Sequence, residues 1–219
     1  MAYAAEKLEL QEHRREPAPL LDPRFRRLIG NDKWARLPAA VRARFGKRLA
    51  GGAVALYRGK VVECRLSRLG WLLAQLLRPV GAPLPLSAEE DIEALVAVSE
   101  DRQGKGQYWN RLYGRRRAKP QLIQSAKRFA GKSGLEEYIG GGIAMALDIE
   151  VMPDGLRFVA QDYFISLFGK RCPLPRWMVP GMCVVVHRDL GGGRFEFVLA
   201  VRHRLFGELV YQRAEFCDA

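Results

Sequence analysis

Short apolar runs alternate with polar turn residues through most of the second half of the chain, between residues 145 and 216. Proline and glycine interrupt these runs at residues 152–155, three glycines do so at residues 191–193, and Gly207 follows Phe206. Connections this short fit antiparallel hairpins, because a parallel connection needs roughly a dozen residues or more. The pattern therefore predicts a series of antiparallel strands joined by tight turns.

The first part of the chain has the spacing of helices mixed with further strands. A short helix is expected over residues 24–29. In the next segment Trp34, Leu37, Val41 and Phe45 recur at three- and four-residue intervals, which places them on one helical face. These helices are expected to pack their apolar face against a sheet.

The middle of the chain predicts one more helix and several strands. A leucine-rich stripe indicates a helix over residues 66–77. Residues 91–98 fit a helix or a strand, and we favour a strand because their apolar residues alternate and a turn follows. The other expected strands lie at residues 53–65, with a turn at 58–60, and at 107–113, 122–129 and 135–139.

Together these elements predict one domain over residues 22–219, of α+β class and mainly antiparallel β-structure. Roughly eight to ten strands would form a curved sheet or a closed β-barrel, calycin-like or helix-grip-like, with two or three covering helices. The proline-rich residues 172–180 are expected to cross one end of it. Residues 1–21 are polar and are expected to form a disordered or loosely attached arm.

Composition adds a strong positive charge to this picture. The chain has 219 residues, 48% of them hydrophobic, and 36 Lys and Arg against 24 Asp and Glu give a net charge of +12. Such a charge favours anionic partners such as nucleic acid, lipid headgroups or an acidic protein. The basic residues are scattered, however, and no RNA-binding aromatic signature or helix-turn-helix pattern accompanies them. A solvated basic surface is the favoured interpretation.

The four cysteines do not form a metal or redox motif. None belongs to a C-x-x-C pair, and Cys183 and His187 would lie roughly 13 Å apart along a strand, too far for one zinc ion. We expect structural thiols in a reducing compartment, and hence a cytoplasmic protein. No metal and no cofactor is expected.

Neither a secretory signal nor a membrane span is expected. Residues 1–16 are charged and lack an apolar core. The most apolar helix candidate, residues 66–80, contains Arg68 and Arg78 and falls short of the roughly 20 apolar residues that a span needs.

The strand over residues 107–113 suggests a polar group inside an apolar interior. Arg111 shares a face with Trp109 and Tyr113, and a buried guanidinium needs a partner, which Glu137 or Glu136 would supply. The pair is either a structural ion pair or the polar anchor of a ligand pocket. The glycines at residues 140–142 lack the context of a phosphate loop and predict a bulge or a close backbone approach.

An ordered set of short motifs resembles a protein family, the bacterial domain of unknown function 4166, over about residues 22–216. The motifs are Leu37-Pro38-Ala39-Ala40-Val41-Arg42, Trp109-x-Arg111, Glu137-x-x-Gly140, Asp154-Gly155-Leu156, Leu174-Pro175-Arg176-Trp177 and Leu205-Phe206-Gly207-Glu208-Leu209-Val210-Tyr211. The chain departs from the family at Phe45, where a histidine is usual. The family often follows a saccharopine-dehydrogenase-like NAD(P)-binding domain, so the resemblance implies an NAD(P)-dependent oxidoreductase as a partner.

Three hypotheses for function remain at this point. The first is a non-catalytic domain that binds a small hydrophobic or amphipathic molecule in an apolar cavity. The second is a basic interaction module for an acidic protein, an oxidoreductase or nucleic acid. The third, ranked last, is an enzyme that uses Glu137 or His187 as an acid or base. The ligand-binding residues expected under the first hypothesis are Trp71, Trp109, Arg111, Glu137, Tyr163 and Trp177.

Overall fold

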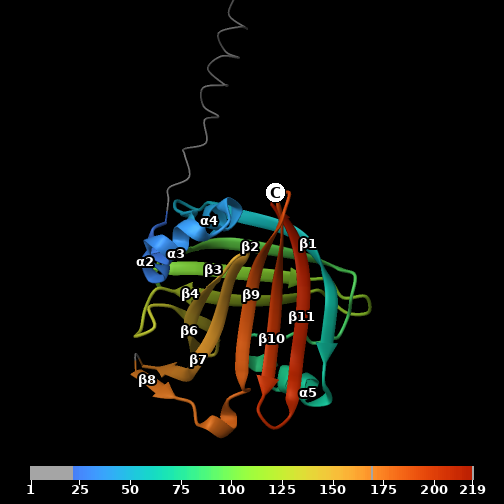
Figure 1. The fold of residues 1–219 in the computed structure, drawn as a ribbon. Helices are drawn as coiled ribbons and strands as arrows, with labels where there is room; N and C mark the ends of the chain where they lie inside the picture. The colour runs from blue at the N-terminus through green and yellow to red at the C-terminus, as the bar shows by residue number, and fades with distance from the viewer. Residues whose placement is uncertain (1–21, 169, 219) are drawn as a thin grey trace, which may run out of the picture.

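The computed structural model describes residues 22–168 and 170–218, and most of them belong to one antiparallel sheet (Figure 1). The arm expected for residues 1–21 lies outside the described residues. The strands are β1 (Val54–Leu66), β2 (Ile92–Asp101), β3 (Gly106–Tyr113), β4 (Gln121–Arg128), β5 (Glu136–Gly140), β6 (Ile143–Met152), β7 (Gly155–Leu167), β8 (Lys170–Pro173), β9 (Met182–Gly191), β10 (Arg194–His203) and β11 (Gly207–Asp218). The helices are α2 (Arg24–Ile29), α3 (Asn31–Arg36), α4 (Ala39–Gly46) and α5 (Arg68–Leu76), with 3-10 turns η1 (Arg78–Val80) and η2 (Arg176–Met178).

The sheet closes on itself as a barrel. Ten strands form the ring in the order β6-β5-β4-β3-β2-β1-β11-β10-β9-β7, and β7 pairs with β6 to complete it. Strand β8 pairs with the end of β7 beyond the point where β7 leaves β9. Of the two predicted alternatives, the closed antiparallel barrel is therefore the one that forms.

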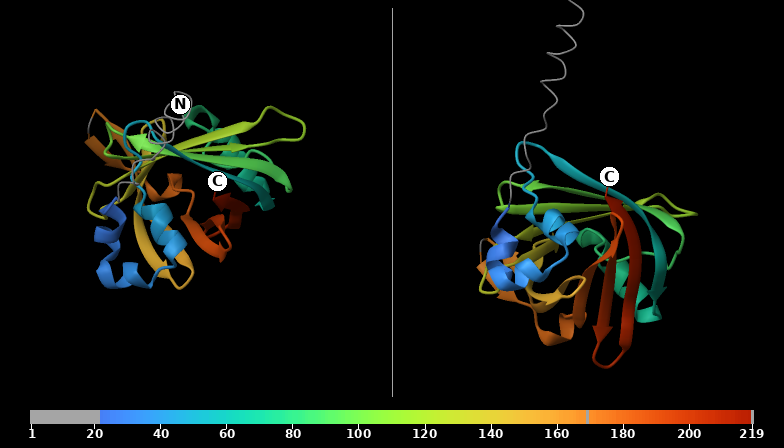
Figure 2. Two further views of the ribbon diagram at one scale, coloured as in Figure 1. Left: turned by 90° about the horizontal axis from the view of Figure 1, so that it is seen from above. Right: turned by 45° about the horizontal axis from the view of Figure 1, so that its top comes forward.

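The barrel has two different ends. Helices α2 to α4 lie over one end, which we call the α4 end, beside the β9–β10 hairpin (Figure 2). At the opposite end lie α5, η2 and the β10–β11 hairpin (Figure 1). The interior between them is a single apolar core that includes Phe158, Phe195 and Phe216 from the strands and Phe45 from α4.

The predicted hairpins at residues 152–155, 190–193 and 206–207 are confirmed. The strand chosen for residues 91–98 is also confirmed, as β2. Two details differ. There are four α-helices in the described residues instead of two or three, because Pro38 divides the apolar stripe of residues 34–45 between α3 and α4. A proline cannot donate the backbone hydrogen bond that a continuous helix needs there.

Strand β1 runs without the turn that was predicted at residues 58–60, so that prediction was wrong. Gly59 pairs with Ala94 on β2 and with Phe216 on β11. A Cβ atom added to Gly59 would lie 1.9 Å from the backbone oxygen of Glu215. The glycine is therefore present because two strands come very close together, and not because the chain reverses direction.

Helix α5 lies flat against the start of β11. The hydroxyl of Ser67 accepts a hydrogen bond of 3.0 Å from the Gly70 backbone N–H, which caps the helix. A Cβ atom on Gly70 would lie 1.9 Å from the Leu209 carbonyl oxygen, so the glycine sets how closely helix and strand approach. No helix among the described residues is long and apolar enough to cross a membrane.

The glycine run at residues 140–142 forms the β5–β6 turn, with positive φ at all three positions. The pairing register shifts between Tyr138 and Gly140, and a Cβ atom on Gly140 would lie 2.2 Å from the Val80 carbonyl oxygen. The prediction of a bulge with close backbone approach is confirmed.

Candidate functional site

The barrel interior encloses a cavity of about 70 Å³. In a barrel of eight strands, side chains alone can fill the interior. A ring of ten strands is wider, so some space remains inside this barrel. A water molecule needs roughly 10–15 Å³ of such space, which makes the cavity large enough for several waters or for part of a small ligand. Most of its wall is apolar and aromatic, including Val96, Trp109, Phe158, Val185, Phe197 and Leu199.

A buried group of polar side chains interrupts this apolar wall, and Glu137 on β5 is its centre. The Lys127 ammonium lies 3.0 Å from Glu137 Oε2, and the Ser125 hydroxyl donates a 2.7 Å hydrogen bond to Oε1. The Arg111 Nη2 atom lies 3.3 Å from the same Oε1 and also donates to Ser125 Oγ. Three neighbouring strands, β3, β4 and β5, thus bring two cations to one carboxylate.

Burial and charge act in opposite directions on this group. Burial alone would raise the pKa of Glu137, but the charges of Lys127 and Arg111 and the Ser125 hydrogen bond lower it to about 2. Burial lowers the pKa of Lys127, and the Glu137 carboxylate opposes that effect. Glu137 is therefore an anion at neutral pH, with its oxygens already occupied by donors.

The hydrogen-bonding groups that this cluster leaves free are donors. Arg111 uses Nη2 for Glu137 and Ser125, and its Nε and Nη1 have no hydrogen-bond partner within the described residues. Its side chain is 23% exposed, whereas those of Lys127 and Glu137 are 6% and 5% exposed. The indole Nε1 of Trp109, which also lines the cavity, is buried and has no partner in the described part of the chain.

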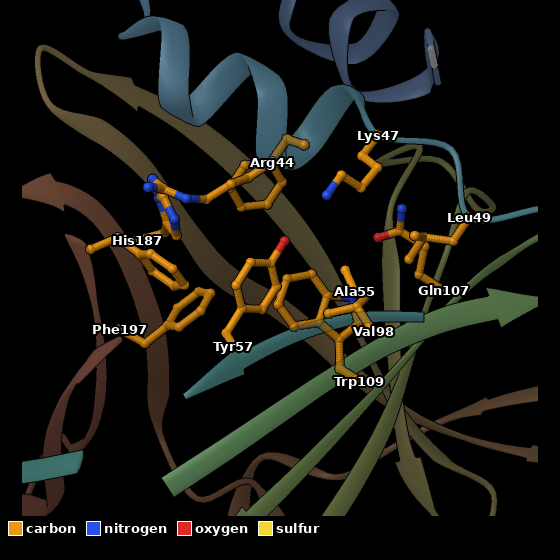
Figure 3. Close-up of a pocket in the computed structure, with 12 residues that line it drawn as sticks. Arg44, Lys47, Leu49, Ala55, Tyr57, Val98, Gln107, Trp109, His187 and Phe197 are labelled. Carbon is orange, nitrogen blue, oxygen red and sulfur yellow. The ribbon is translucent and has the colours of Figure 1, made fainter. Parts of the chain in front are cut away.

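A second, smaller cavity of about 20 Å³ lies under α4 (Figure 3). Trp109 and Phe45 line both cavities, so only their side chains and a few neighbours stand between the two. His187 on β9 also lines the smaller one and is only 1% exposed. Neither of its ring nitrogens has a partner among the described residues. Burial, followed by the nearby Arg44 charge, lowers the pKa of His187 to about 3, so the ring is neutral at neutral pH.

Helix α4 is fastened to this end of the barrel by Arg44. Its guanidinium lies 3.0 Å from Asp189 Oδ1 on β9 and 2.6 Å from Asp218 Oδ2 on β11, and it stacks over the Phe195 ring at 4.3 Å. The adjacent Phe45 packs edge-on against His187, with ring centroids 5.0 Å apart. These contacts hold α4 in place over the α4 end of the barrel.

The structure brings together three of the six residues expected to bind a ligand, Trp109, Arg111 and Glu137, at the larger cavity. Tyr163 is 7% exposed and does not line this cavity. It lines a surface groove instead, where its hydroxyl donates to the Gly181 carbonyl at 3.3 Å. Burial raises its pKa.

Trp71 and Trp177 do not line the cavity, and the expectation that they are wall residues is corrected. Trp71 on α5 is 51% exposed and Trp177 in η2 is 83% exposed. The helix carries a broad apolar stripe, but it lies at the barrel end opposite α4 and contributes no residue to the cavity wall. Gly70 and Ala74 are buried, and Leu73 packs against the core. The proline-rich segment crosses the barrel end with its tryptophan turned to solvent.

Sequence reasoning missed Lys127 and Ser125, although a signal for them existed. Ile123, Ser125 and Lys127 occupy every second position of β4, so their side chains share one face of that strand. The interior position of Ile123 would have placed the lysine inside as well. It also missed the pairing of Phe45 with His187, because residues 142 positions apart in the chain leave no local pattern.

Comparison with protein families gives a match over most of the chain. A family model described as a domain of unknown function (DUF4166) matches residues 37–216, which include all of the ring except the last two residues of β11. No curated protein matches the chain.

Proposed function

The chain belongs to the DUF4166 family, a domain of unknown function, and we propose that its barrel binds a small amphipathic molecule that carries a hydrogen-bond acceptor. A carboxylate is the acceptor that fits best. The apolar part of the molecule would lie against Val185, Phe197 and Leu199, and the acceptor would face Arg111. An apolar pocket with a few polar groups at one point is the usual construction of a small-molecule site.

The observation that carries this proposal is the excess of donors around Glu137. The carboxylate already receives Lys127, Arg111 and Ser125, so a ligand gains nothing by offering it another donor. Two cations face one anion, which leaves one positive charge uncompensated when Lys127 is protonated. A negatively charged hydrogen-bond acceptor would bind the free guanidinium nitrogens of Arg111 and balance the uncompensated positive charge.

Octanoate and its neutral analogue octanol provide a direct test. Wild-type protein is expected to bind octanoate more tightly than octanol, as followed by calorimetry and by the change in total tryptophan fluorescence, to which Trp109 at the cavity contributes. Arg111→Leu removes the charged donors and is expected to weaken octanoate binding by about 10- to 100-fold, since hydrogen bonds to charged groups contribute about 1.5–3 kcal/mol. Octanol binding should change little.

Two further variants separate the charge from the cavity itself. Ala214→Leu fills the cavity from β11 without touching the cluster, and both compounds should then bind more weakly. Arg117→Leu removes an exposed positive charge from the loop after β3 and should alter neither. The proposal is wrong if wild-type protein shows no saturable binding of either compound, or if Arg111→Leu weakens both equally.

A further inference from the structure

The barrel end opposite α4 exposes large apolar side chains on segments that are distant in sequence. In η2, Trp177 is 83% exposed, and at the tip of the β10–β11 hairpin Leu205 and Phe206 are 79% and 59% exposed. Helix α5 adds Trp71 and Leu76 at the same end, 51% and 67% exposed. Scattered exposed apolar residues need no explanation, but several on the projecting segments of one end do.

Contacts hold two of these segments, η2 and the hairpin, close together. Gly181, just after η2, packs so tightly on β10 that an added Cβ atom would lie 2.3 Å from the Arg202 carbonyl oxygen. One surface groove is lined by Arg176 from η2 and by His203 and Arg204 from the hairpin. The His203 ring stacks on Phe206 with centroids 4.7 Å apart, which fixes the hairpin tip. We call this surface, η2 and the β10–β11 tip, the docking end.

The surface groove that the docking end borders is strongly basic. The groove lining has a single carboxylate, Asp162, and four basic side chains, Lys132, Arg171, Arg176 and Arg204. Arg171 is paired with Glu136, whereas Arg176 and Arg204 have no ion-pair partner in the described part of the chain. Unpaired arginines beside exposed tryptophan and phenylalanine match the chemistry of a membrane interface, where aromatic rings lie at the level of anionic headgroups.

We propose that the docking end binds the surface of an anionic lipid membrane. The side chains of Trp177, Leu205 and Phe206 enter the headgroup region, and the guanidinium groups of Arg176 and Arg204 contact lipid phosphates. Figure 1 shows the η2 segment and the hairpin projecting from the lower end of the barrel, as insertion into a fluid interface requires. A nucleic acid would supply the phosphates but would give no favourable environment to the aliphatic Leu205.

The test is sedimentation of the purified chain with vesicles of phosphatidylcholine alone and of phosphatidylcholine mixed with phosphatidylglycerol. Wild-type protein is expected to bind the mixed vesicles preferentially and to lose binding as salt rises. The variant Arg176→Glu/Arg204→Glu is expected to bind them at least about 30-fold more weakly, since each basic residue near such a surface contributes about a factor of five. Trp177→Ala/Phe206→Ala should lose about tenfold or more.

A matched pair at the α4 end serves as the control. Leu190→Ala/Arg194→Glu changes one exposed leucine and one exposed arginine on the β9–β10 hairpin and should leave vesicle binding unchanged. All three variants alter exposed side chains, and unchanged thermal midpoints will show that each is folded.

The lipid proposal is overturned if wild-type protein binds neither kind of vesicle, binds both equally, or loses as much with the control pair. Retention of RNA or of an acidic protein that depends on Arg176 and Arg204, with no vesicle binding, would assign the same surface to that partner instead. The inference does not rest on the cavity, because octanoate binding should be the same in all of these variants.

Discussion

Glu137→Gln is expected to lower the free energy of unfolding by about 3–5 kcal/mol at neutral pH, because it leaves the buried Lys127 and the partly buried Arg111 without their counter-charge. The substitution changes shape very little, so packing is not the cause. Chemical denaturation at neutral pH gives the measurement. Adding Lys127→Met should restore a large part of the loss, since an apolar side chain needs no partner in this interior.

A control for this variant exists on the barrel surface. Glu150→Gln makes the same change in the exposed pair with Arg157, whose atoms are 2.8 Å apart, and should have little effect. Equal effects of the two substitutions would contradict a buried role for the Glu137 cluster.

The same cluster predicts a loss of stability in acid. The pKa of Glu137 in the folded protein, about 2, is below its ordinary value of 4.5, so the folded state holds the proton less tightly. The stabilisation is complete above pH 4.5 and disappears as the pH falls towards 2, by about 3 kcal/mol in all. Glu137→Gln should show no such loss over this range beyond that of other groups.

His187→Phe is expected to remove a second, larger acid sensitivity that begins at higher pH. The pKa of His187 is lowered from 6.5 to about 3, so the folded state binds this proton less readily than the unfolded state does. Protonation of His187 therefore costs no stability above pH 6.5 and lowers stability as the pH falls from 6.5 towards 3. Each pH unit costs about 1.4 kcal/mol, or about 5 kcal/mol over the whole range. Phenylalanine cannot be protonated and fits among Phe45, Phe195 and Phe197.

The surroundings of His187 decide how clean this effect is. Arg44 disfavours its protonation, while Asp189 and Asp218 favour it weakly. The variant should also be more stable at neutral pH, because two unpaired ring nitrogens leave the interior. His203→Phe, at a partly exposed histidine, is the control and should keep the acid dependence. If His187→Phe unfolds over the same pH range as wild-type protein, another group is responsible.

Most of the fold could be predicted from local features of the sequence. The glycine and proline turns at 152–155 and 190–193 are properties of a few adjacent residues, and so is the alternation that places Trp109 and Arg111 on one face. Their consequences were visible in sequence. The turn predicted at Gly59 was wrong because only local sequence was available. A glycine where two paired strands approach closely and a glycine in a turn look alike until the partner strand is known.

The candidate site was predictable only in part. The buried charge of Arg111 demanded a partner, and Glu137 was among the two named. Trp71 and Trp177 were misplaced, because an apolar side chain carries no mark of whether it faces the core or the solvent. Ring closure decides that question, and it depends on pairings between strands far apart in the chain.

One such pairing has a consequence for how the chain folds. Strand β1 pairs with β11, so the first and last strands of the ring must meet across about 140 intervening residues before the barrel exists. Contacts between such distant segments make folding slow, on the order of milliseconds to seconds for β-rich topologies. A nascent chain that still lacks β11 has no enclosed interior, and its incomplete sheet has two edge strands with unpaired backbone groups. Such edges promote aggregation with other nascent chains, so we expect chaperones to bind the chain during synthesis.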